Sequence, residues 1–425
     1  MEYFSKTNQT KGYILVTVNQ YMNWKRNISI FLASQTISLF GSSIVQYAIM
    51  WYITLTTQSG VMMTIGILCG FVPTFLLSPF AGVWADRYNR KILIILSDSA
   101  IALATLILAI FFLSGYKSLW MLFLMYIIRS IGTGIQTPAV GAILPQIVPE
   151  KQLTKVNGIN GSIQAFVMLV SPMISAALLS ITTLEMLFFI DVVTAAIAVA
   201  TLLFFLRIPP HEKALEQGKV GYFDDFKKGL SYIKNHAFLK TLFTFFAIFF
   251  VLAAPVSFLT PLQVTRTFGG DVWRLSAIEI AFSVGMMIGG AVIAVWGGFK
   301  NRMHTMALSS IFLAVCTLLL GIVPNFWIYL CIMGIAGVGM PLFNTPTTVL
   351  LQEKVEGDYL GRIFGVFSMI STSMMPLGML IFGPISDLID IELLLIGTGI
   401  AMLMISFFLV GNKVLVEAGK PKEEK

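Results

Sequence analysis

Charged residues are scarce in this chain of 425 residues, at 12% of the sequence, whereas 57% of the residues are hydrophobic. A soluble globular chain carries about 25% charged residues, so the deficit argues against a soluble protein. Cysteine is scarce as well. Cys69, Cys316 and Cys331 lie in separate apolar runs without CxxC or histidine spacing, so we expect neither disulfides nor a metal site.

Several sequence motifs of enzymes are absent. The chain has no Gly-x-x-x-x-Gly-Lys-Ser/Thr loop, which argues against direct ATP drive, and neither His-Glu-x-x-His nor Gly-x-Ser-x-Gly occurs. We therefore predict that the protein is not an enzyme and uses no cofactor. The net charge of +7 comes from cations that border apolar runs, so it fits membrane topology rather than a nucleic-acid partner.

Apolar runs of about 20 residues recur along the chain, and a run of that length can cross a bilayer as a helix. We predict twelve such spans. Their approximate ranges are 27–56, 60–83, 91–114, 118–143, 156–180, 184–206, 237–262, 275–297, 304–323, 325–350, 361–386 and 390–411.

The distribution of cations predicts the topology. With both termini in the cytoplasm, 24 of the 28 Lys and Arg residues fall on the cytoplasmic side and three on the outside, and Arg129 lies within a span. Such an excess favours this orientation. The expected organisation is a cytoplasmic extension (1–23), a six-helix bundle (24–206), a linker (207–236), a second six-helix bundle (237–411) and a cytoplasmic tail (412–425). The linker is expected to carry an amphipathic helix at 222–233.

The two halves of the chain resemble each other. Gln136-Thr137-Pro138 ends the fourth predicted span, and Asn344-Thr345-Pro346 ends the tenth, 208 residues later. Both precede a short charged loop that ends in glycine, at Gly158 and Gly365. This pattern predicts a parallel duplication of six helices, as in transporters whose two bundles rock against each other.

A ten-residue segment, Gly82-Val-Trp-Ala-Asp86-Arg87-Tyr-Asn-Arg90-Lys91, joins the second and third predicted spans. A loop this short makes the spans antiparallel neighbours, and we expect Gly82 to let their backbones approach closely. Asp86 is expected to accept hydrogen bonds from amides in the first turn of the next helix. The cations are expected to pair with carboxylates or helix C-termini.

This spacing resembles the signature loop of major facilitator superfamily transporters, Gly-x-x-x-Asp-Arg-x-x-Arg-Lys, with Asn89 in place of the usual glycine. The resemblance implies an all-α membrane protein with twelve transmembrane helices in two six-helix bundles that work by alternating access. It also implies a gating loop that consists of Gly82, Asp86, Arg87, Arg90 and Lys91.

Arg129 lies near the middle of the fourth span. A charge there costs at least ~2.5–3.5 kcal/mol, so its guanidinium must face the protein interior. The segment Arg129-Ser-Ile-Gly132-Thr-Gly134 resembles the superfamily's span-four motif, although Ile131 replaces the expected glutamine. In antiporters that motif is associated with proton coupling. The alternative is that Arg129 pins helix carbonyls.

Three membrane carboxyl groups are weighed for proton coupling. Asp98 lies seven residues into the third span, where it can carry a proton or serve as a structural anchor. Asp191, near the outer end of the sixth span, is interpreted as structural. Glu279 lies one turn into the eighth span, and a carboxyl group partly removed from water can carry a proton. We therefore predict that Arg129, Glu279 and Asp98 couple proton movement, with external exposure as the alternative for Glu279.

Polar residues in the first span share one stripe. Gln35, Ser38, Ser42 and Gln46 follow one another at spacings of three, four and four, which places them on one helical face. Such a stripe must face a cavity or a partner helix rather than lipid. We predict that these four residues, with Asn344, line the substrate cavity.

Within the superfamily the chain is similar to the macrolide-efflux-like drug:proton antiporters of bacteria, through Asn23-Trp24-Lys25-Arg26-Asn27 and Phe282-Ser283-Val284-Gly285. The resemblance implies a monomeric carrier in the bacterial plasma membrane that exports a small amphiphilic compound against protons. The alternatives are a proton-coupled carrier of a siderophore, lysophospholipid, tetracycline or nutrient, and a non-transporting membrane sensor.

Overall fold

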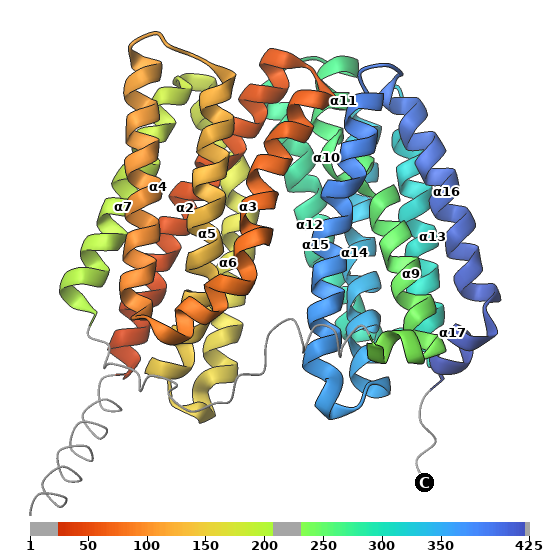
Figure 1. Cartoon of the computed structure of the whole chain (residues 1–425). Coiled ribbons are helices and arrows are strands. Elements are labelled where there is room, and N and C mark those ends of the chain that lie inside the picture. Colours follow the sequence, from red (N-terminus) through yellow and green to blue (C-terminus); the bar gives the residue numbers. More distant parts are fainter. Residues whose placement is uncertain (1–23, 207–230, 421–425) are drawn as a thin grey trace, which may run out of the picture. The chain divides into compact units, whose positions relative to one another are not determined.

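The computed structural model describes residues 24–206 and 231–420, and every regular element in these two ranges is a helix (Figure 1). Within them, eleven helices are long and apolar enough to cross a membrane. A further apolar helix, α9, has 16 residues. The prediction of an all-helical membrane protein is confirmed.

Six long helices make up the first half of the chain: α2 (Trp24–Thr57), α3 (Gly60–Arg87), α4 (Arg90–Leu113), α5 (Leu119–Ile147), α6 (Glu150–Ile181) and α7 (Leu184–Phe205). The second half begins with α9 (Ala237–Leu252), α10 (Ala254–Phe258) and α11 (Thr260–Thr267). It continues with α12 (Val272–Trp296), α13 (Arg302–Leu320), α14 (Phe326–Lys354), α15 (Gly357–Ile385), α16 (Ile391–Gly411) and α17 (Lys413–Ala418).

The seventh predicted span, 237–262, is not one continuous helix. It is divided into α9, α10 and α11, and each of the two later helices has a proline in its first turn, Pro255 and Pro261. Proline has no amide hydrogen and clashes with the preceding turn, so it suits a helix start and kinks or interrupts a helix when it lies further in. The breaks before α10 and α11 fall at these two prolines, whereas Pro138 and Pro172 lie inside continuous helices.

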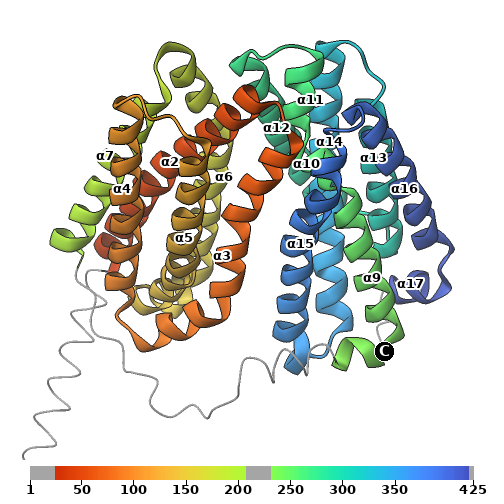
Figure 2. The same cartoon turned by 45° about the horizontal axis from the view of Figure 1, so that its top comes forward.

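Contacts divide the described residues into two compact units. The first unit holds residues 24–49 and 69–206, and the second holds residues 50–68 and 231–420. In the first unit α4 packs against α5 and α7. In the second, α13 packs against α14 and α16, and α12 packs along α14 (Figure 2). The α12–α14 contact is close, because a Cβ at Gly337 would lie 2.2 Å from the carbonyl oxygen of Phe282.

Residues 50–68 are held in the second unit by Asp387. Its carboxylate accepts hydrogen bonds from the Ser59 hydroxyl at 2.6 Å and from the Gly60 amide at 2.7 Å, and Arg266 forms an ion pair with it at 2.8 Å. Burial alone would raise the pKa of Asp387, but these hydrogen bonds outweigh it and hold the pKa below its usual range. The carboxylate therefore stays charged at neutral pH.

The turn between α3 and α4 differs from the loop predicted at 82–91. Helix α3 continues through Arg87, so only Tyr88 and Asn89 lie outside a helix. The predicted close approach at Gly82 is wrong for the described residues, since a Cβ there would meet no atom within 4 Å. Asn89 caps α4 by accepting hydrogen bonds from the amides of Lys91 and Ile92. The hydrogen bonds expected of Asp86 stay a prediction. The side chain of Asp86 lies outside what the structure describes.

The linker and both ends of the chain fall partly outside the described residues. The amphipathic helix expected at 222–233 is one such segment, and only its last residues are described, within a short helix at 231–235. The proposed extension at 1–23 is outside as well. The tail is described through residue 420, where α17 packs against α9 and α13.

Candidate functional site

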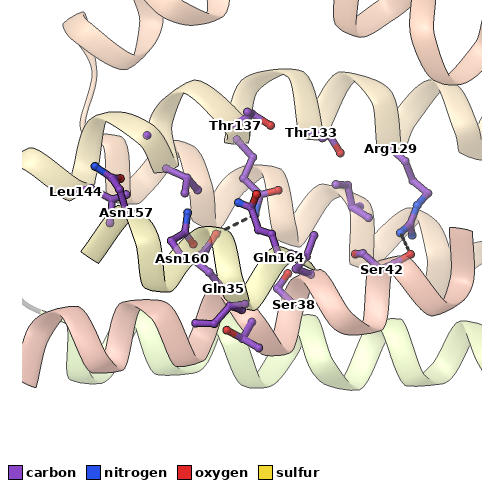
Figure 3. A pocket seen from close by; sticks show the side chains of 17 residues that line it. Gln35, Ser38, Ser42, Arg129, Thr133, Thr137, Leu144, Asn157, Asn160 and Gln164 are labelled. Carbon is purple, nitrogen blue, oxygen red and sulfur yellow. Dashed lines mark hydrogen bonds between the residues drawn. The ribbon is translucent and has the colours of Figure 1, made fainter. Parts of the chain in front are cut away.

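A polar cavity of about 360 Å³ lies in the first unit, among α2, α5 and α6. Figure 3 shows polar side chains from these three helices pointing toward one another. Helix α5 contributes Arg129, Thr133 and Thr137, and α6 contributes amide side chains. The polar residues that line the cavity are Gln35, Thr36, Ser38, Ser42, Arg129, Thr133, Gln136, Thr137, Asn157, Asn160 and Gln164.

The polar stripe predicted on α2 faces this region. Gln35, Ser38 and Ser42 line the cavity, and Ser42 also lines an adjoining cavity of about 360 Å³ together with Gln46. Asn344 lies on α14 in the second unit, where its side chain is exposed. Its role in a substrate cavity stays a prediction.

The guanidinium of Arg129 is buried and paired with a carboxylate. Its Nη1 lies 2.5 Å from Oδ2 of Asp191 on α7, and its Nη2 donates to the Ser42 carbonyl oxygen at 2.9 Å. Asp191 also accepts hydrogen bonds from the Ser42 hydroxyl at 2.9 Å and from the Thr105 hydroxyl at 3.1 Å. Both charges therefore have several partners, which a buried ion pair needs to offset its loss of hydration.

Asp98 is another buried carboxylate of the first unit, with 3% of its surface exposed. Its Oδ1 accepts hydrogen bonds from Ser38 at 3.0 Å and from Gln136 at 2.9 Å. Within the described residues its Oδ2 has no hydrogen-bond partner. Asp98 thus contacts two residues that line the cavity, Ser38 and Gln136. Its Oδ1 is hydrogen-bonded to both, whereas its Oδ2 is buried without a hydrogen-bond partner among the described residues.

Sequence reasoning missed the partner of Arg129 and one wall of the cavity. Asp191 is interpreted as structural from its position in the sixth span. It lies 62 residues from Arg129 along the chain, and no local pattern indicates that the two side chains meet. The amide wall on α6 had a readable signal. Asn157, Asn160 and Gln164 follow at spacings of three and four, the same periodicity that identified the stripe on α2.

The cations of the α3–α4 turn contact helix ends within the first unit. Arg90 donates to the carbonyl oxygens of Ala85 at 2.9 Å and Ala142 at 3.0 Å. Lys91 donates to the Leu206 carbonyl oxygen at 2.8 Å, just past the end of α7. A cation at a helix C-terminus is favoured by the helix dipole. Arg87 is exposed.

Glu279 lies on α12 in the second unit and lines a separate cavity of about 260 Å³. Four phenylalanines and four methionines form much of the wall, and Ser257, Thr260 and Thr317 add hydroxyl groups. The apolar lining residues include Phe249, Phe250, Phe282, Phe343, Met333, Met340, Met375 and Met402. Glu279 is the single charged residue among those that line this cavity.

The two units repeat with an offset of 207 residues, which relates both ends of α5 (Leu119–Ile147) to both ends of α14 (Phe326–Lys354). At this offset the cavity around Gln46 and the cavity around Glu279 use equivalent positions of their helices. The pairs that line both are Ser42 and Phe249, Ser43 and Phe250, Gln46 and Ala253, Tyr126 and Met333, Arg129 and Ala336, Thr133 and Met340, and Met168 and Met375.

No metal site is formed by the side chains of residues 24–206 and 231–420, where no group of three or more His, Cys, Asp or Glu could hold an ion. Cys69, Cys316 and Cys331 are free thiols. The chemistry available in the cavities is therefore that of carboxylates, one guanidinium, amides and hydroxyl groups.

Helices that could span a membrane and cavities between them define the class of protein as a multi-pass membrane transporter. The model of the Major Facilitator Superfamily matches residues 30–379, and the chain belongs to this family. It is 32% identical over 377 residues to macrolide efflux protein A of Streptococcus pyogenes, covering 88% of this chain and 93% of that protein.

More distant relatives share the fold. The staphyloferrin A transporter of Staphylococcus aureus is 23% identical over 389 residues, which cover 90% of this chain and 96% of that protein. Among solved structures, the nucleoside transporter NupG aligns with a TM-score of 0.69 at 16% identity, covering 92% of this chain and 99% of that one. At that identity the likeness concerns the fold alone.

Proposed function

We propose that this transporter exports amphiphilic drugs, of macrolide or multidrug type, in exchange for protons. The relative named macrolide efflux protein A supports the class of cargo. The exporter would work as a monomer in the bacterial plasma membrane, with both termini in the cytoplasm as the distribution of Lys and Arg favours. Amphiphilic cargo would enter the polar cavity from the cytoplasm or the inner leaflet.

The geometry of Asp98 is the observation that carries the proton step. Its open Oδ2 can take a proton while Oδ1 keeps its hydrogen bonds from Ser38 and Gln136. A proton there removes one negative charge from a buried position directly behind the cavity wall. Cargo in the cavity then interacts differently with the protonated and the unprotonated protein. Coupling needs such a difference in interaction free energy between two states.

Arg129 and Asp191 would set the electrostatic background of this step. The pair carries no net charge and is fixed by Ser42, a residue of the cavity wall. We propose that Arg129 couples through this contact, since a change in the cavity around Ser42 acts on the ion pair. Glu279 is the second carboxyl group proposed to take part in coupling, from the cavity of the other unit.

The segment of Gly82, Asp86, Arg87, Arg90 and Lys91 is proposed as the gate. Arg90 and Lys91 contact the ends of other helices. These contacts support a gate whose hydrogen bonds break when those helices move. Replacing Asp86 with alanine is expected to abolish proton-driven export. Wild-type rates in Asp86→Ala would remove the gating role.

Everted membrane vesicles test the proton step. An imposed proton gradient should drive accumulation of a radiolabelled macrolide in the parent protein but not in Asp98→Asn, whereas exchange of labelled for unlabelled cargo should persist in the variant. Ser97→Ala is the matched control, since Ser97 is also buried on α4. Proton-driven accumulation in Asp98→Asn at the parental rate would overturn the assignment.

The relative that carries the name staphyloferrin A transporter favours a second cargo, a siderophore. A susceptibility panel in a pump-deleted host separates the two. Expression should raise the inhibitory concentration of macrolides or other amphiphiles. Equal susceptibility with and without the gene, together with altered siderophore release, would support the second cargo.

A further inference from the structure

We propose that the cavity around Glu279 binds a lipophilic monocation, with the carboxylate paired to the positive charge and the phenylalanine and methionine side chains around the apolar body. This names a substrate class for the proposed exporter, and it rests on that function only in treating the ligand as cargo.

The wall of the cavity suits a cation with a flat apolar body. Phe249 and Phe343 both line the cavity, and their rings are stacked with centroids 5.1 Å apart and an interplanar angle of 14°. Aromatic faces attract a cation within about 6 Å of the ring centroid. Methionine side chains adapt to ligands of different shape, so the four methionines favour a class of compounds over a single one.

The carboxylate of Glu279 lacks a counter-charge within the described part of the chain, where no hydrogen bond or ion pair holds it. The nearest arginines along the chain are committed elsewhere, since Arg266 pairs with Asp387 and Arg274 pairs with Asp271. A charge in apolar surroundings is costly unless it is paired. A cationic ligand supplies that partner.

The remaining polar groups of the cavity do not select a pattern of hydrogen bonds. The Thr317 hydroxyl donates to the carbonyl oxygen of Leu313 in its own helix at 2.9 Å. Ser257 and Thr260 offer neutral hydroxyl groups. Recognition therefore rests on one negative charge and on apolar contact, and a volume of about 260 Å³ suits an aryl ammonium or pyridinium group.

Binding of tritiated 1-methyl-4-phenylpyridinium to the purified full-length protein in detergent tests the proposal without a proton gradient. The ligand carries a permanent charge, and 4-methylbiphenyl has the same shape without it. We expect Glu279→Gln to weaken binding of the cation at least tenfold, and Glu279→Asp to restore part of the loss. Glu353→Gln is the matched control, because Glu353 is a partly exposed carboxylate of the same unit that pairs with Arg302.

The wild-type protein alone provides a second measurement, which stands even if a variant fails to fold. An excess of 4-methylbiphenyl should displace the cation at least tenfold more weakly than unlabelled 1-methyl-4-phenylpyridinium does. Equal displacement by the two compounds, or unchanged affinity in folded Glu279→Gln, would overturn the proposal. Charge-selective binding without proton-driven transport would leave this proposal intact while removing proton antiport.

Discussion

The first and second units form cavities at equivalent helix positions. The cavity of the first unit is lined by polar and charged side chains, and that of the second mostly by apolar ones. Ser42 and Arg129 of the first unit correspond to Phe249 and Ala336 of the second. The buried ion pair of the first unit has no equivalent, since Asp191 corresponds to Thr398, whose hydroxyl donates to the Leu394 carbonyl oxygen. The two units thus share helix positions at an offset of 207 residues but differ in the side chains that line their cavities.

Under the proposed function, this difference would separate the two requirements of a proton-coupled exporter. Proton movement needs charged groups held by hydrogen bonds, and the first unit would supply them through Asp98, Arg129 and Asp191. An amphiphile needs apolar contact, and the second unit would supply it through phenylalanine and methionine. Exchanging residues between equivalent positions of the two units tests this assignment.

Arg129→Ala is expected to have the largest effect. It leaves Asp191 buried without its counter-charge, which should lower the free energy of unfolding by about 3–5 kcal/mol. Thermal unfolding in detergent measures the loss. A single variant as stable as the parent would mean that the ion pair is not what holds α5 to α7.

The double variant Arg129→Ala, Asp191→Thr gives the first unit the residues of the second. Because no uncompensated charge remains, stability should return to within about 1–2 kcal/mol of the parent. Proton-driven export should stay lost. Recovery of export together with stability would remove Arg129 from the coupling mechanism.

Gln136→Leu is expected to have the next largest effect. It removes one of the two donors to Asp98, and a hydrogen bond to a charged group is worth about 1.5–3 kcal/mol. Gln35→Leu is the comparison variant on the same cavity wall, since it leaves both donors to Asp98 in place and removes only the 3.5 Å hydrogen bond that the Oε1 of Gln35 accepts from Gln136. Chemical unfolding of both variants, read by tryptophan fluorescence, should give the larger loss for Gln136→Leu.

Phe249→Leu tests the apolar cavity. It removes an aromatic ring that lines the cavity but keeps an apolar side chain, so we expect a loss of about 0.5–1.5 kcal/mol in the free energy of drug binding. Equilibrium binding of a labelled cargo measures it. Phe407→Leu, on the exposed face of α16, is the control. Equal affinities in the two variants would place the cargo elsewhere.

Asn89→Ala and Asn301→Ala compare a feature that the two units share, an asparagine cap on α4 and on α13. Loss of the exposed Asn89 cap should cost about 0.5–1 kcal/mol of stability. Asn301→Ala should cost more, because Asn301 also donates to the Val416 carbonyl oxygen at 2.9 Å. Thermal unfolding of both variants decides the order, and a larger loss for Asn89→Ala would contradict it.

Much of the fold was predictable because its signals are local. Runs of apolar residues identified the membrane helices, and the spacing around Asp86 and Arg87 indicated the family that the comparison confirmed. The broken seventh span has a local signal in Pro255 and Pro261, each of which lies in the first turn of a helix. The α4 cap has a local signal too, since Asn89 directly precedes the helix.

The local pattern of residues is enough to make this chain an apolar, helical membrane protein, because helix length and hydrophobicity depend only on neighbours along the chain. Tertiary packing brings Arg129 to Asp191, and Ser38 and Gln136 to Asp98. Those contacts depend on how each helix is rotated about its axis against its neighbours. Packing fixes that rotation, and no local pattern records which face will meet which.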